Sequence, residues 1–405
     1  MKVKNQFLVI AILTIFLGIL LCSCKTENSE VPEDRYSVFQ KGFASSMGNK
    51  IVESPDGFYL FNGNFLTFLD KNFENPVTVC DKPECRHLEE AEEHVVECNA
   101  FYGNPRDIKY YNGKLYIAAD AMDGANQAIY QVDLDGNGRN KIYTAENQGE
   151  FCFLIYKGDI IAYEQQYNET QVSAEIIRFP INDPKQAETL FSGKETDINN
   201  SGISYLINDE DNLYFNFVDR EKWTDIRFYT TDLTSNETER ICKDADRFLL
   251  IGSDRLIGSE NIERNNEDRT WENKYFQFSK DGKLEKELTD KDYEALSRGA
   301  IIDGIDDQYI YLSDICYGAD APPAEERYHY IYTYDGKEAG RIYQTGTDSL
   351  SFYPGNDDYA IIQDYDGTEQ VYYKVDKSLI ESGQTLEPIE FFRFDPTEFS
   401  YFYSY

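Results

Sequence analysis

The sequence predicts an all-β protein that is built from repeated small sheets. Aromatic residues make up 15% of the chain, including 32 Tyr and 26 Phe, and these side chains favour strands. Residues that favour helices do not form long runs with a period of 3.6. A loose repeat with a period of about 43 to 57 residues also runs along the chain, and each copy has an apolar strand, a tight turn and a second strand rich in aromatic and β-branched residues.

The turn and second strand of this repeat occur seven times. The seven copies are Asp56–Leu60, Asn112–Ile117, Gly158–Ile161, Asp211–Phe215, Ser253–Ile257, Asp307–Tyr311 and Asp357–Ile361. A second hairpin follows in most copies, with tips at Asp133–Gly138, Asp232–Asn236, Lys280–Lys283 and Tyr334–Lys337. Two hairpins supply four strands per copy, and the Gly and Asn residues of the tips supply the positive φ angles that tight turns need. Seven four-stranded units predict a single seven-bladed β-propeller, in which each sheet buries both faces against its neighbours.

The first 24 residues have the layout of a secretory signal. Lys2 and Lys4 precede an apolar run over residues 7–22, and the small residue Ser23 stands directly before Cys24. The run is short for a membrane span, and polar residues follow it. The Leu-x-Ser-Cys ending resembles the lipobox of bacterial lipoproteins, which implies cleavage after Ser23 and acylation of the Cys24 thiol. An uncleaved single-span anchor is the alternative.

The chain is therefore divided into a signal peptide (1–23), a lipidated Cys24 with a flexible polar tether (24–45), and a propeller (46–405). The propeller carries an insertion at 80–106. The aromatic segments Phe391–Phe394 and Phe399–Tyr405 are too apolar for a loose tail, so we expect a last strand there that helps to close the ring. The predicted location is the extracytoplasmic side of the cell membrane, with the membrane bound through the lipid on Cys24.

The charge of the chain restricts its partners. The formal charge is −35, and removal of residues 1–23, which hold Lys2 and Lys4 and no acidic residue, changes it to −37. A surface this acidic repels phosphate backbones, so no nucleic-acid partner is expected.

The insertion contains the most specific local pattern of the sequence. It reads Cys80-Asp81-Lys82-Pro83-Glu84-Cys85-Arg86-His87, followed by Cys98-Asn99-Ala100. Three thiols and one imidazole could form a tetrahedral Cys₃His zinc site, although a single residue between Cys85 and His87 departs from the common zinc spacing. Thiols outside the cell tend to oxidise, so a disulfide that joins Cys98 to Cys80 or Cys85 is the alternative. Zinc is the one cofactor considered, and both interpretations stay open.

These patterns carry a resemblance to a known family. The segment Ile129–Gly136 looks like the third strand and turn of TolB-type propeller repeats. The mature chain resembles the extracytoplasmic β-propeller lipoproteins of Gram-positive bacteria, a family of unknown function. The Cys-x-Lys-Pro-x-Cys-x-His element with its downstream Cys-Asn-Ala is similar to one in that family. The resemblance implies a propeller attached to the outer face of the cell membrane.

Four aromatic residues are candidates for a ligand-binding face. Trp223 and Trp271 are the only tryptophans, and each lies five residues before a Phe of a third strand. Loops between second and third strands share one propeller face with the connections between blades, so these loops, the loop from Tyr317 to Tyr328 and the insertion should meet there. Aromatic side chains with a polar group suit a recognition surface. Packing between blades is the alternative for the two tryptophans.

No catalytic residue is identified. The three histidines, His87, His94 and His329, accompany no nucleophile elbow, phosphate loop or His-Glu-x-x-His helix. Asp133–Gly138 begins like a calcium loop, but Thr144 stands where a bidentate Glu is needed, so a hairpin turn is predicted. The sequence favours a binding or scaffold module for a protein or glycan ligand. The alternative is an enzyme: a carbohydrate-active hydrolase or lyase, or a metal-dependent enzyme that uses the Cys/His cluster.

Overall fold

A computed structural model describes the chain at residues 50–85, 87, 98–121, 126–146, 151–167, 172–193, 201–203, 205–219, 226–265, 270–315, 322–323, 326–344, 348–353, 355, 358–365, 368–382 and 385–394. All of these residues belong to one compact unit, Tyr36–Tyr405. The expected signal peptide, Cys24 and the tether lie outside the described residues, as does Phe399–Tyr405. Within the described ranges, no helix has the length and apolar character needed to cross a bilayer.

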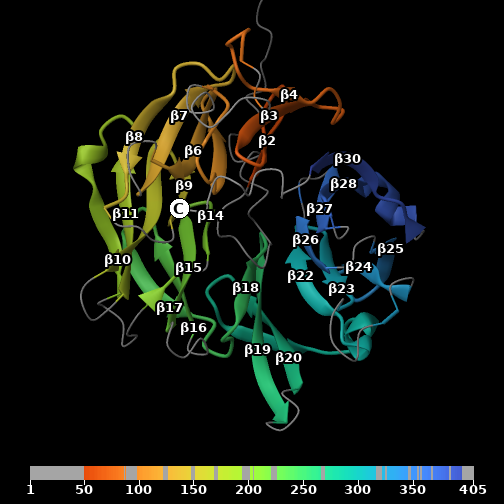
Figure 1. Cartoon of the computed structure of the whole chain (residues 1–405). Helices are drawn as coiled ribbons and strands as arrows, with labels where there is room; N and C mark the ends of the chain where they lie inside the picture. Colours follow the sequence, from red (N-terminus) through yellow and green to blue (C-terminus); the bar gives the residue numbers. More distant parts are fainter. Residues whose placement is uncertain are drawn as a thin grey trace, which may run out of the picture. The chain divides into compact units, whose positions relative to one another are not determined.

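The unit is a seven-bladed β-propeller, as predicted (Figure 1). In blades 1 to 3 the strands are β1 (Ile51–Glu53), β2 (Gly57–Asn62), β3 (Phe65–Asp70) and β4 (Val77–Thr78); β5 (Asp107–Tyr111), β6 (Lys114–Asp120), β7 (Gln127–Asp133) and β8 (Asn140–Thr144); and β9 (Phe151–Tyr156), β10 (Asp159–Tyr167), β11 (Val172–Pro180) and β12 (Glu188–Ser192). In blades 4 and 5 they are β13 (Ser201–Gly202), β14 (Leu206–Asp209), β15 (Asn212–Asp219), β16 (Ile226–Asp232) and β17 (Glu237–Ile241); and β18 (Phe248–Ile251), β19 (Arg255–Asn265), β20 (Thr270–Ser279) and β21 (Leu284–Leu288).

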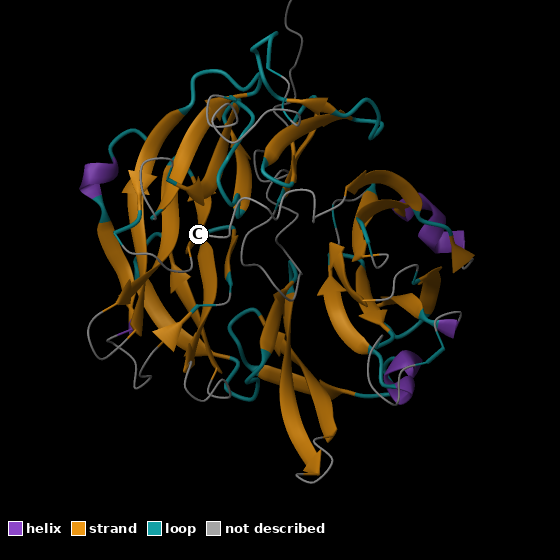
Figure 2. Cartoon of the chain, in the orientation of Figure 1, coloured by secondary structure: helices purple, strands orange, loops and turns teal. Residues whose placement is uncertain are grey.

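A connection within blade 7 adds a short strand to the sheet of blade 6. Blade 6 contains β22 (Ile301–Ile305), β23 (Tyr309–Ser313), β24 (Tyr328–Thr333) and β25 (Glu338–Tyr343), and blade 7 contains β26 (Asp348–Tyr353), β27 (Tyr359–Tyr365), β28 (Gln370–Asp376) and β30 (Ile389–Phe394). The connection between β28 and β30 supplies β29 (Thr385–Leu386), which pairs in parallel with β25 of blade 6. Short 3₁₀ helices lie between strands at η2 (Pro184–Gln186), η4 (Glu294–Arg298) and η6 (Lys377–Ser382) (Figure 2).

Six of the seven turns found in the sequence separate the first two strands of a blade, and in blade 4 the turn lies between β14 and β15, because β13 and β14 both pair with β15. The tips of the second hairpins also lie between third and fourth strands, where Gly136, Gly282 and Gly336 have φ angles of 86°, 77° and 87°. Gly57 differs from the expectation for an Asp-Gly turn, because it lies within β2 and is not among the residues of positive φ. A Cβ atom there would come within 2.1 Å of the Leu69 carbonyl oxygen, so the glycine is required by close approach of β3.

The apolar core consists of seven clusters, one between each pair of neighbouring blades. The cluster between blades 2 and 3, for example, joins Tyr116 and Ile129 to Phe153 and Phe179. The last cluster joins blade 7 to blade 1 through Tyr359, Tyr372 and Phe392 on one side and Phe58 on the other. Glu53 of β1 also accepts a 3.0 Å hydrogen bond from the Tyr359 hydroxyl. These contacts close the ring, and β30 contributes to the closure as expected for Phe391–Phe394.

Candidate functional site

The structure describes two of the four residues that were proposed for the ligand-binding face. Trp223 and Tyr317 lie outside the described residues. The backbone of Trp271 lies in β20, opposite Glu263 of β19, in a hairpin that Figure 1 shows projecting beyond the other blades. Tyr328 is the first residue of β24 and directly follows the loop between the second and third strands of blade 6.

Tyr328 belongs to a group of aromatic and basic side chains at one end of blade 6. Its ring lies 4.7 Å, centroid to centroid, from that of Tyr343, the last residue of β25. The guanidinium of Arg341 lies 5.3 Å from the centre of the Tyr328 ring. Arg298, at the end of η4 in the connection from blade 5, lies 5.7 Å from the centre of the Tyr330 ring. We call Arg298, Tyr328, Arg341 and Tyr343 the tyrosine–arginine patch.

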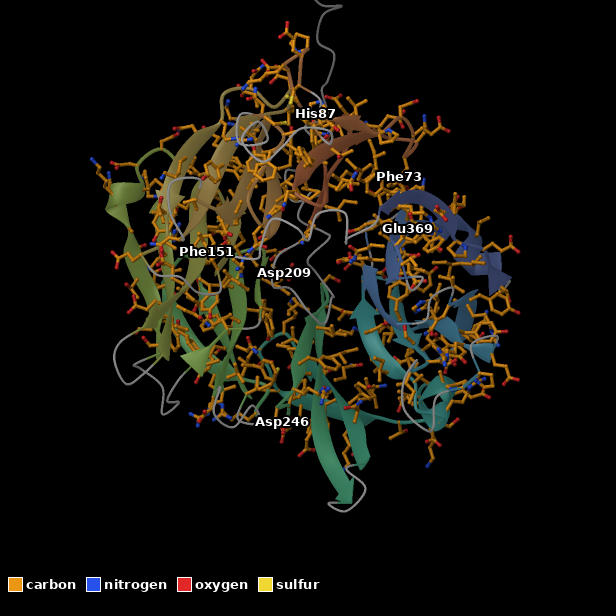
Figure 3. All side chains as sticks on the ribbon, in the orientation of Figure 1. Phe73, His87, Phe151, Asp209, Asp246 and Glu369 are labelled. Carbon is orange, nitrogen blue, oxygen red and sulfur yellow. The ribbon has the colours of Figure 1, made fainter. Side chains whose placement is uncertain are left out.

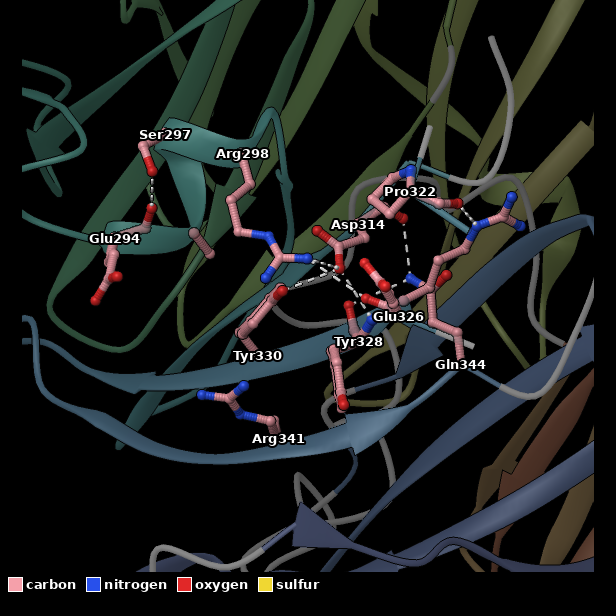
Figure 4. Close-up of polar contacts among 12 residues, drawn as sticks. Glu294, Ser297, Arg298, Asp314, Pro322, Glu326, Tyr328, Tyr330, Arg341 and Gln344 are labelled. Atoms are coloured by element: carbon pink, nitrogen blue, oxygen red, sulfur yellow. Dashed lines mark hydrogen bonds and ion pairs between the residues drawn. The ribbon is translucent and has the colours of Figure 1, made fainter. Parts of the chain in front are cut away.

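Asp314 lies between Arg298 and the tyrosines of β24 and connects them through polar contacts (Figure 4). Its carboxylate is buried and accepts 3.0 Å hydrogen bonds from the backbone N–H of Tyr328 and from the hydroxyl of Tyr330. Arg298 lies 3.7 Å from the same oxygen, and Gln344 donates to the Asp314 carbonyl at 2.9 Å. Because a buried carboxylate needs such partners, Asp314 fixes the start of β24 relative to η4.

Sequence reasoning found Tyr328 but missed Arg298, Asp314, Arg341 and Tyr343. A local signal for Asp314 does exist. Asp314 directly follows the apolar second strand of blade 6, and Asp120 of blade 2 and Asp364 of blade 7 stand at the corresponding place of their own second strands. No local signal marks Arg298, because it comes from the connection that precedes blade 6.

The structure brings together all four residues of the predicted metal or disulfide site. The sulfur atoms of Cys80, Cys85 and Cys98 and a ring nitrogen of His87 all lie within 4.8 Å of one another. Cys98 Sγ is 3.8 Å from Cys80 Sγ and 3.5 Å from His87 Nδ1. Such a set of donor atoms could hold a metal ion. Figure 3 labels His87 near the blade that contains β2 to β4.

Hydrogen bonds to β3 hold the two ends of the insertion. Leu66 of β3 accepts from the N–H of Val79 at 2.9 Å and donates to the carbonyl of Ala100 at 2.8 Å. Cys80 and Cys98 are therefore brought side by side by the sheet of blade 1. The chain between them contains a turn in which the Cys85 N–H donates to the Lys82 carbonyl, while His87 has a φ angle of 52° in the left-handed region.

The environment shifts the pKa values of two of these thiols, Cys80 and Cys98, in opposite directions. Burial acts against ionisation of Cys80, but hydrogen bonds from the N–H groups of Lys82 and Asn99 and from neighbouring thiols outweigh it and lower the pKa of Cys80. Burial raises the pKa of Cys98 to about 12, although the Ala100 N–H opposes the shift. Burial also lowers the pKa of His87, which favours the neutral imidazole that metals bind.

His329 lies in a buried polar row and not in a hydrolytic triad. The Ser313 hydroxyl donates to Asp303 at 2.5 Å and lies 2.5 Å from His329 Nδ1, so the serine stands between the other two groups. A triad requires the imidazole in that middle place. His329 is 1% exposed, and burial lowers its pKa to about 3, so its imidazole is a weak base at neutral pH. His329 is therefore a packed residue of β24.

Two further cysteines and the Asp133–Gly138 segment also have defined places in the fold. Cys152 and Cys242 are buried in the apolar clusters between blades 3 and 4 and between blades 4 and 5. Cys316 and His94 lie outside the described residues. Asp133–Gly138 forms the hairpin turn between β7 and β8, as predicted, with Gly136 N–H donating to the Asp133 carbonyl at 2.9 Å.

Comparisons with known proteins agree with the propeller fold and do not show a family. No family model matches the sequence, and no curated protein is similar to it in sequence. A structure described in a study of two prolyl endopeptidases is similar over 90% of this chain, with a TM-score of 0.50 and 10% identity; this chain spans 51% of that one. The β-propeller domain of the Trilobed protease from Pyrococcus furiosus (TM-score 0.47, 13% identity, 71% of this chain and 83% of that one) and TolB from Acinetobacter baumannii (0.38, 12%, 84% and 81%) are also similar. At these identities the likeness concerns fold alone.

Proposed function

We propose that this chain is a propeller anchored to the outer face of the cell membrane through Cys24, and that it binds a protein partner through the tyrosine–arginine patch. The anchor is inferred from the sequence of residues 1–24, where a lipobox-like ending follows a short apolar run. The strong negative charge makes nucleic acid an improbable ligand. A rigid ring that presents loops at one end suits a binding platform.

The exposed aromatic and basic side chains of the patch carry this proposal. Tyr343 is 45% exposed, and the side chains of Arg298 and Arg341 are 43% and 38% exposed. Tyr and Arg are enriched among the residues that contribute most to protein–protein binding. These residues are held by partners beneath them, so little side-chain freedom remains to be lost on binding. A glycan is the second ligand class, because the same flat rings can contact sugars.

Catalysis receives less support than binding. Within the described ranges, the Ser, His and Asp side chains that lie close together in blade 6 are buried and wrongly ordered for nucleophilic attack. The enzymatic alternative, a carbohydrate-active hydrolase or lyase, remains the competing proposal, and turnover of surface polysaccharides by the purified protein would establish it.

Removal of the exposed patch side chains is expected to abolish partner capture. The full lipidated chain and the Arg341→Ala, Tyr343→Ala double variant should be cross-linked in native membranes and the captured proteins quantified by mass spectrometry. A Tyr or Arg at the centre of an interface contributes about 2 kcal/mol or more, which is about thirtyfold in affinity. Loss of both side chains should therefore weaken binding by up to about a thousandfold and reduce the captured partner to background.

The matched control changes two exposed apolar residues on outer strands, Leu284→Ala and Ile389→Ala, which are 48% and 64% exposed. This control should capture the partner as the unchanged chain does. Equal loss in both variants, or no loss in the patch variant, would contradict the proposal. Binding of a purified glycan that depends on Tyr343 would assign the patch to the second ligand class.

A further inference from the structure

We propose that Cys80, Cys85, His87 and Cys98 bind one zinc ion as a structural site. The proposal is independent of the binding function described above, since it concerns the insertion between blades 1 and 2. It chooses between the two interpretations that the sequence left open.

Two distances between the donor atoms match those that a tetrahedral zinc ion imposes. Zinc binds thiolate sulfur at about 2.3 Å and imidazole nitrogen at about 2.0–2.1 Å, so tetrahedral angles separate two sulfurs by about 3.8 Å and a sulfur from a nitrogen by about 3.5 Å. The corresponding distances from Cys98 Sγ are 3.8 Å to Cys80 Sγ and 3.5 Å to His87 Nδ1. Cys85 Sγ lies within 4.8 Å of all three other donors, which completes a set of four.

A disulfide fits this arrangement less well. Bonded sulfurs lie about 2.05 Å apart, whereas the Cys98 and Cys80 sulfurs are separated by 3.8 Å. A single disulfide would also leave the third thiol and the His87 imidazole together without a shared role. A mixed sulfur and nitrogen set with tetrahedral spacing favours zinc over hard cations such as magnesium or calcium.

The surroundings suit a negatively charged metal–thiolate centre. The backbone N–H groups of Lys82 and Asn99 donate to Cys80, and that of Ala100 donates to Cys98. Such donors orient thiolate ligands and are stronger when the sulfur is charged. Zinc binding releases three thiol protons, and Zn²⁺ with three thiolates and a neutral imidazole has a net charge of −1. The Arg139 guanidinium lies close by, donating to the Cys98 carbonyl at 3.3 Å and stacking on Tyr102 at 4.0 Å.

Four protein donors saturate a tetrahedral ion, so the proposed site is structural and not catalytic. The ion would connect Cys80, at the end of the outer strand of blade 1, to Cys98, which leads into blade 2. Arg139 in the β7–β8 connection of blade 2 contacts the same segment. Metal binding would therefore stabilise the contact between blades 1 and 2.

The test uses the full chain, purified in detergent under reducing conditions. We expect about one zinc per chain by elemental analysis, and a thermal midpoint that falls when a chelator removes the metal and recovers with zinc but not with magnesium. After exchange with Co²⁺, thiolate charge-transfer bands and the visible bands of tetrahedral cobalt should appear. Cys98→Ser and Cys85→Ser should lose most of the metal, and His87→Ala should retain a cobalt spectrum with altered bands.

Cys152→Ala is the matched control, because it removes a buried cysteine outside the cluster and should keep the full metal content. Circular dichroism of each variant separates metal loss from unfolding, and the cobalt spectrum of the unchanged chain gives a readout that needs no variant. Absence of stoichiometric zinc in the unchanged chain would overturn the proposal. A disulfide among Cys80, Cys85 and Cys98, mapped in a second preparation purified without reductant, would then assign the cluster to the alternative interpretation.

Discussion

Replacement of Gly136 by alanine is expected to destabilise the propeller by about 2–5 kcal/mol. The residue has a φ angle of 86°, which costs an L side chain about 1–2 kcal/mol. A Cβ atom there would also lie 2.5 Å from the Val79 carbonyl oxygen of blade 1, and overpacking of this kind adds about 1–3 kcal/mol. The free energy of unfolding, measured in urea, should fall by the sum of these two effects.

Gly113→Ala separates the two effects. Gly113 also has a positive φ angle, 75°, but a Cβ atom there would meet no atom within 4 Å. This variant should therefore lose only the conformational part, about 1–2 kcal/mol. Equal losses of stability at Gly113 and Gly136 would mean that the close approach of the new Cβ to Val79 adds no cost at position 136. Gly336, whose Cβ would lie 2.4 Å from the Asp292 carbonyl oxygen of blade 5, should behave like Gly136.

A rise in pH from about 4 to above 7 is expected to reduce the stability of the fold through two buried carboxyl groups. Burial raises the pKa of Glu164 to about 7, with help from the charge of Glu175 and against a hydrogen bond from the Glu146 N–H. Burial likewise raises the pKa of Asp303 to about 7, against a hydrogen bond from Ser313. A carboxyl whose pKa is higher in the folded than in the unfolded chain binds more protons when folded. Its contribution is therefore complete below about pH 4 and is lost as the pH rises to about 7, by roughly 3 kcal/mol for Glu164 and roughly 4 kcal/mol for Asp303.

The variants Glu164→Gln and Asp303→Asn test this sign. Neither amide ionises, so the stability of each variant relative to the unchanged chain should increase between about pH 4 and pH 8, with most of the increase reached by pH 7. Unfolding in urea at both pH values gives the comparison. Glu188→Gln, a change at an exposed position of β12, is the control and should shift stability equally at both pH values. A difference between the unchanged chain and the Glu164 or Asp303 variants that stays constant with pH would contradict the assignment.

The candidate sites differ in how far local sequence could reveal them. The Cys80, Cys85, His87 and Cys98 donors could be listed from their spacing, but their convergence depends on Leu66 of β3, which bonds to both ends of the insertion. The tyrosine–arginine patch was harder to predict from the sequence. Tyr328 begins β24 and Tyr343 ends β25, 15 residues later in the chain, and the two face each other only because these strands pair in this register. Arg298 comes from the connection between blades 5 and 6 and reaches them through the packing of η4 against blade 6.

The sequence by itself determined the all-β class, the number of blades and the places of the turns. These properties are local. Turn residues set the backbone conformation of a few neighbouring residues, and the spacing of apolar residues within one segment sets its secondary structure. The tertiary structure decided which distant groups meet: the seam between blades 7 and 1, the close approach of β3 that requires Gly57, and the burial of Glu164 and Asp303. Those contacts depend on ring closure and on the depth of each side chain, and neither is encoded by the spacing of residues along one strand.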